Sequence, residues 1–149
     1  MDAVSHIDEL DPAALCAAFA AGRLPKHRWT HEAHLVVCRD ILSRLDPAAA
    51  LVHLRRAIRA YNEATGTANT DDGGYHETLT GYYVGAVHAV VTLPIHELVA
   101  HPSCSRRAPL AHWTPGRLFS TEARRTWVAP DLAPITRWQP RSDTSLDRG

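Results

Sequence analysis

The stretch that decides the fold is "DPAAALVHLRRAIRAYNEATG", residues 46–66. Asp46 followed by Pro47 is a typical helix start, because aspartate caps free backbone N–H groups and proline fits the first helical position. Gly66 is a typical helix stop. Between these signals, apolar side chains recur at helical spacing and predict one buried face, formed by Leu51, Leu54, Ile58 and Tyr61. The stretch therefore predicts a long amphipathic helix in a helical core.

Similar signals on both sides of this helix predict further helices. They are expected over residues 12–22, 31–45, 75–91 and 95–101. Asp11 and Thr30 are the expected caps of the first two of these helices, and Gly22 is the expected stop of the first. Pro94 separates the last two. Gly81 and Gly85 share one face of the predicted helix 75–91, which suggests the close approach of a neighbouring helix.

After Pro102 the chain is rich in proline and arginine, and only one short helix is expected, within residues 114–127. Residues 139–149 have the composition of a disordered tail. The sequence therefore predicts a single all-α domain over residues 1–138. We expect a compact bundle of about five helices with an irregular C-terminal strap.

The composition is that of an ordinary globular protein. The 149 residues are 45% hydrophobic and 21% charged, with a formal net charge of zero. The eight arginines against four acidic residues in 103–149 are too few to indicate nucleic acid binding. We expect no membrane partner, because no run approaches the roughly 20 apolar residues of a membrane span. The N-terminus lacks the residue order of a signal peptide, and the three cysteines suggest no disulfide framework, so a cytoplasmic location is expected.

Ten histidines direct attention to possible sites, and the first is "RWTHEAHLVV", residues 28–37. His31 and His34 lie three positions apart just after Thr30, so both imidazoles project from one side of the first helical turn. This spacing suits a metal pair, although a divalent ion needs at least one further ligand. Cys38, one turn beyond, is expected to line a pocket, to act as a soft ligand or simply to be buried.

The best source of a third ligand is "YHET", residues 75–78, at another predicted helix start. His76 is the expected ligand, and Glu77 is the expected fourth ligand or general base. The metal would be Zn, Fe, Ni or Cu, which histidine ligation does not distinguish. Glu77 equally fits an ordinary first-turn glutamate, and each histidine equally fits an ordinary polar residue.

Two further residues are candidates for a catalytic role. Tyr75 is expected to hydrogen-bond to a residue of the site or to contact a small ligand. Arg124 is a candidate for binding a substrate carboxylate. For the C-terminal arginines, the structural alternative is an ion pair of Arg124 or Arg125 with Asp131 that ties down the tail. Ser120 is the expected cap of the short helix.

Three segments carry a resemblance: "WTHEAHL" at 29–35, "YHETLT" at 75–80 and "GRLFSTEARRTWVAPDLAPI" at 116–135. The chain resembles a family of small bacterial helical proteins of uncharacterised function. The resemblance implies a helical fold in which the two histidine segments share a site. A weaker similarity, at the level of fold alone, is to DinB-like bundles that hold a metal through three histidines.

These observations predict a small metal-dependent enzyme with ligands His31, His34 and His76, acting on a small molecule. Two alternatives stay open. One is a metal-free enzyme in which the same histidines act as general acid or base. The other is a helical module that binds a small ligand without catalysis. A homodimer is possible in each case.

Overall fold

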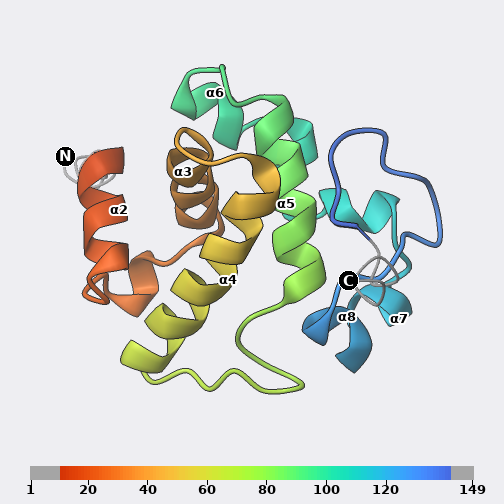
Figure 1. The fold of residues 1–149 in the computed structure, drawn as a ribbon, viewed down its shortest axis with the longest axis horizontal. Coiled ribbons are helices and arrows are strands. Elements are labelled where there is room, and N and C mark those ends of the chain that lie inside the picture. The colour runs from red at the N-terminus through yellow and green to blue at the C-terminus, as the bar shows by residue number, and fades with distance from the viewer. Residues whose placement is uncertain (1–10, 142–149) are drawn as a thin grey trace.

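Four helices form the core of the computed structural model, which describes residues 11–141 (Figure 1). They are α2 (Pro12–Ala20), α3 (His31–Leu42), α4 (Pro47–Ala64) and α5 (Glu77–Ala89). No β-strand occurs between residues 11 and 141, and the predicted all-α class is confirmed. Residues 1–10 and 142–149 lie outside the described part of the chain.

Three of these helices begin at the caps that the sequence predicts. The side chains of Asp11, Thr30 and Asp46 accept hydrogen bonds from the backbone N–H groups three positions ahead. Each such cap stabilises a helix start by about 1 kcal/mol. The predicted stops are also confirmed, since Gly22 and Gly66 follow the ends of α2 and α4 with positive φ.

The start of α5 differs from the sequence prediction. The helix was expected from Tyr75 but begins at Glu77, and His76 is its N-cap. The Nδ1 atom of His76 accepts a hydrogen bond from the backbone N–H of Leu79 at 3.1 Å. An imidazole here takes the place of the serine or aspartate that usually marks a cap, which is why the boundary was missed.

Shorter helices make up the remaining helical structure of residues 11–141. They are η1 (Lys26–Arg28), α6 (Ile95–Val99), η2 (Pro102–Cys104), η3 (Ala108–Ala111), α7 (Pro115–Leu118) and α8 (Thr121–Arg125). The single helix expected within 114–127 is therefore two helices. Ser120 separates them and caps the second, because its hydroxyl accepts a hydrogen bond from the N–H of Ala123.

The helices surround one core. α3 packs against α2, α4 and α5, while α5 lies between α4 and the C-terminal segment (Figure 1). All four side chains of the predicted α4 stripe are buried. The largest fully buried side chains include Trp113, Leu35, Leu98 and Leu118. The indole N–H of Trp113 donates to the carbonyl of Val128 at 3.0 Å, which ties the C-terminal segment to this core.

The glycine face of α5 contacts the C-terminal strap, residues 126–141, and the expectation of a neighbouring helix there is wrong. A Cβ added at Gly85 would overlap the carbonyl oxygen of Trp138. A Cβ at Gly81 would lie 2.8 Å from Pro140 and 3.0 Å from Trp127. The absence of side chains at both positions lets the strap lie directly on the helix.

Part of the segment predicted to be disordered belongs to this strap. Gln139 donates to the carbonyl of Ile135, and Pro140 packs at Gly81. The rest of that prediction, residues 142–149, falls outside the described residues. Cys16, Cys38 and Cys104 are all free thiols, and no helix within 11–141 combines the length and hydropathy of a bilayer-crossing segment.

Candidate functional site

A cavity of about 540 Å³ opens between α3, α4, the start of α5 and the loop 65–76 that joins α4 to α5. Its volume lies in the range of small-molecule sites. Leu54, Ile58 and Leu79 provide apolar wall, and His31, His34 and His76 all line the same space. The structure thus brings the three sequence-predicted histidines to one cavity.

The loop 65–76 has a fixed shape where it borders this cavity. The Asn69 side-chain oxygen accepts hydrogen bonds from the Asn62 amide at 2.9 Å and from the backbone N–H of Tyr75 at 3.0 Å. Gly74 has φ of +81°, and a Cβ there would lie 2.5 Å from the carbonyl oxygen of Ala68. Only glycine suits this conformation, which lets the end of the loop lie directly against residues 68 and 69.

The first turn of α3 presents His31 and His34 to the cavity. Thr30 fixes the helix start, and the three-residue spacing places both imidazoles on one side of the turn. Trp29 stacks on the His34 ring with centroids 3.7 Å apart and on Phe19 at 4.4 Å. A hydrophobic staple joins the residue before the N-cap to the fourth residue of the helix. Trp29 and His34 occupy these two positions, with a histidine in place of the usual apolar side chain.

His34 is held as a neutral imidazole with a defined tautomer. Its Nδ1 lies 2.7 Å from the carbonyl oxygen of Thr30, and because a carbonyl only accepts, Nδ1 carries the proton. Burial lowers the pKa of His34 to about 4, and the charge of Arg106 acts in the same direction. Nε2 is then the hydrogen-bond acceptor, and it has no partner among residues 11–141.

His31 is held through its other ring nitrogen, Nε2, whereas His34 is held through Nδ1. Its Nε2 donates to the carbonyl oxygen of Cys104 at 2.7 Å, and its ring meets that of Tyr83 edge-on at 5.1 Å. The hydroxyl of Tyr83 donates to the carbonyl of Ser105 at 2.6 Å. In the neutral ring, Nδ1 is the acceptor that no described side chain or backbone group engages.

His76 differs from this pair because both of its ring nitrogens have backbone partners. Nδ1 accepts from the N–H of Leu79, and Nε2 donates to the carbonyl of Leu118 at 2.9 Å. Burial lowers the pKa of His76, which favours the neutral form that these two bonds require. The ring therefore joins α5 to the end of α7, and neither nitrogen has a lone pair to offer a metal.

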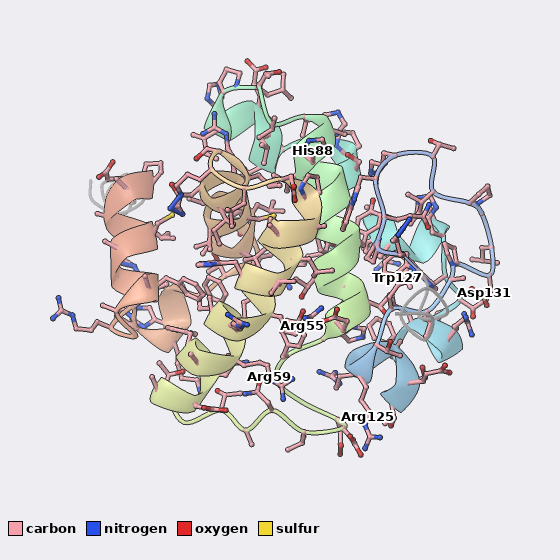
Figure 2. The ribbon with its side chains drawn as sticks, in the orientation of Figure 1. Arg55, Arg59, His88, Arg125, Trp127 and Asp131 are labelled. Carbon is pink, nitrogen blue, oxygen red and sulfur yellow. The ribbon has the colours of Figure 1, made fainter. Side chains whose placement is uncertain are left out.

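Glu77, expected as a base or ligand, is occupied by an ion pair. Its two carboxylate oxygens accept from Arg55 of α4 at 2.9 and 2.7 Å, and Oε1 also accepts from the Tyr75 hydroxyl at 2.7 Å. Figure 2 shows Arg55 and Arg59 on the side of α4 toward the start of α5, and Arg59 lies over the Tyr75 ring. Burial raises the pKa of the Tyr75 phenol, which stays protonated and donates. These contacts fix the helix start.

Arg124 is also a structural contact in this structure. Its NH1 donates to the carbonyl oxygens of Gly74 and Tyr75 at 3.1 and 3.3 Å, which links α8 to the cavity loop. The proposed pairing with Asp131 is wrong. Arg125 instead pairs with Asp71 of the loop at 2.8 Å, and Asp131 accepts from the backbone and hydroxyl of Thr114 (Figure 2).

Several cavity residues were not identified from the sequence. The space is also lined by Lys26, Asn62, Thr67 and Arg106. Cys38 was expected to line a pocket, to be a soft ligand or to be buried, and it is a buried residue that borders this cavity. Each of the four is an ordinary polar residue in a loop or on a helix, and no spacing rule connects it to the histidines. Arg106 lies far from His34 in the sequence, so no short stretch could indicate that the two residues line the same cavity.

The three-histidine metal centre is not formed by these residues. Among residues 11–141, no group of three His, Cys, Asp or Glu side chains is placed to hold a metal ion. The engagement of His76 by two backbone groups is the physical reason. Binding of Zn, Fe, Ni or Cu stays a prediction of the sequence that this geometry does not favour.

Comparison with family models, curated proteins and solved structures finds no match for this chain. The resemblance to a family of small bacterial proteins therefore stays a prediction.

Proposed function

We propose that the protein binds a small organic molecule in the cavity between α3, α4 and α5, with His31 and His34 as its polar contacts. The observation that carries this proposal is the arrangement of the two imidazoles. Each lines a cavity of about 540 Å³, and each has one nitrogen fixed by a backbone carbonyl while the other lacks a partner within 11–141. Placed polar groups beside apolar and aromatic wall, as Trp29, Leu54, Ile58 and Leu79 provide here, are typical of ligand sites.

Catalysis by proton transfer is the second candidate, and the fixed tautomer of His34 favours it. The backbone bond to Thr30 orients the ring, so Nε2 is ready to accept a proton. However, a base with a pKa of about 4 is far weaker than one near 7, which general-base catalysis at neutral pH prefers. The low pKa of His34 therefore makes binding the better candidate.

The test of binding uses N-phenyl-1-naphthylamine, a neutral dye that fluoresces in apolar sites. We expect saturable binding to the full chain and a loss of affinity of about tenfold or more in Thr67→Trp, whose indole would fill the cavity. Val52→Trp is the matched control, because Val52 is 41% exposed and does not line the cavity. Equal affinity in the two variants would overturn the proposal.

Metal analysis tests the metal-dependent alternative. Protein purified after growth with Zn, Fe, Ni and Cu supplied should hold no stoichiometric ion, because His76 retains its two backbone bonds. One equivalent of metal that is lost in both His31→Ala and His76→Ala would favour the metal enzyme over the proposed binding site.

A further inference from the structure

The charged residues that line the cavity are all of one sign. None of its lining residues is aspartate or glutamate, while Lys26 and Arg106 both line it. Acidic and basic residues are equally numerous in the whole chain, so this local excess does not follow from composition. Glu32, the acidic residue in the turn that carries the two histidines, is exposed and is not part of the lining.

Lys26 and Arg106 are the two basic residues of this lining, and they make none of the contacts that hold six arginines elsewhere in residues 11–141. Arg44, Arg55 and Arg125 form ion pairs with carboxylates, and Arg39, Arg117 and Arg124 donate to backbone carbonyls. Within residues 11–141, neither the ammonium of Lys26 nor the guanidinium of Arg106 makes such a bond. Both side chains are exposed, so they stand at the mouth of the cavity.

The wall beyond these cations sets two further requirements on a ligand. Trp29, Leu54, Ile58 and Leu79 offer aromatic and aliphatic surface to an apolar body. The partnerless nitrogen of neutral His34 is an acceptor, so it is satisfied by an O–H or N–H donor, and His31 places a second ring nitrogen without a described partner on the same wall.

From this arrangement we propose that the cavity takes a small organic anion, with its carboxylate, sulfonate or phosphate held by Lys26 and Arg106. The ligand's apolar or aromatic body packs on Trp29 and Ile58, and its hydroxyl or N–H group donates to the histidine pair. This inference rests on the proposed binding function and adds the charge of the ligand. Opposite charge at a cavity mouth both raises affinity and speeds encounter.

The experiment compares two dyes with the full chain. They are 8-anilinonaphthalene-1-sulfonate and the neutral N-phenyl-1-naphthylamine, which share the rings and the N–H donor and differ in the sulfonate. We expect the anionic dye to bind about tenfold more tightly at low salt, with a preference that shrinks as salt rises toward about 0.5 M. Thr67→Trp should weaken both dyes.

Charge-removing variants locate the effect. Lys26→Met and Arg106→Met should each weaken the anionic dye by about threefold more than the neutral dye, and the double variant by about tenfold more. Arg107→Met is the matched control, since Arg107 is an exposed neighbour that does not line the cavity.

The outcomes separate the two proposals. Equal binding of both dyes, or a preference that persists in the double variant, would overturn the anion inference and leave the cavity as a binding site. Failure of both dyes to bind, or binding that Thr67→Trp does not weaken, would overturn the binding function itself.

Discussion

At the scale of the residue, Glu77 fixes the start of α5. Its carboxylate joins Arg55 of α4 through two hydrogen bonds and also receives the hydroxyl of Tyr75. The Glu77 side chain is only 10% exposed, whereas that of Arg55 is 39% exposed. A nearly buried carboxylate depends on such partners, because removal from water disfavours its charge.

Glu77→Gln should therefore lower the free energy of unfolding by about 1–3 kcal/mol. The amide cannot replace the bidentate charge contact, although the exposure of Arg55 keeps the cost below that of breaking a fully buried pair. Urea denaturation measures the loss. Asp40→Asn is the control, since its pair with Arg44 is exposed and is worth at most about 0.5 kcal/mol. Equal effects of the two substitutions would show that the Glu77 contacts do not stabilise the fold.

At the scale of the element, α5 meets the C-terminal strap without intervening side chains. The backbone of Trp138 approaches Gly85, and Pro140 and Trp127 approach Gly81. Four-residue spacing puts both glycines on one face, so the sequence did predict a close approach. It could not predict that the neighbour is irregular chain, because the strap has no periodic pattern of its own.

Gly85→Ala tests this contact. In an exposed helix the substitution would stabilise by about 1 kcal/mol through helix propensity. Here the new methyl group overlaps the Trp138 carbonyl, so we expect a net loss of about 1–3 kcal/mol in the free energy of unfolding. Gly116→Ala in α7 is the control, because no heavy atom lies within 4 Å of its added Cβ, and it should be neutral or slightly stabilising. Stabilisation by both substitutions would mean that the strap does not lie on α5 in solution.

At the scale of the whole molecule, what the sequence predicted was local. Asp11, Thr30 and Asp46 cap helices through bonds to residues three positions away, so their roles are visible in short stretches. The gathering of the three histidines followed from placing both segments at helix starts. The partners of Glu77 and the position of Arg106 beside His34 depend on how distant segments pack, and no local pattern reports them.

The pH dependence of global stability follows from the half-buried His34 and the buried His76. Burial holds the pKa of His34 at about 4, below its ordinary value of 6.5, so the unfolded chain binds a proton that the folded chain refuses. Stability from this group is complete above pH 6.5 and declines as the pH falls from 6.5 toward 4. His76, whose pKa is also lowered, adds to the same slope.

Urea denaturation at several pH values between 6.5 and 4 measures this slope. We expect His34→Gln to lose less stability on acidification than the wild type, because the number of protons taken up on unfolding falls by up to about one. His96→Gln, which changes a side chain that is 80% exposed, should keep the wild-type slope. An unchanged slope in His34→Gln would mean that this imidazole is protonated as readily in the folded protein as in the unfolded chain, and that the cavity wall has no permanently neutral acceptor at this position.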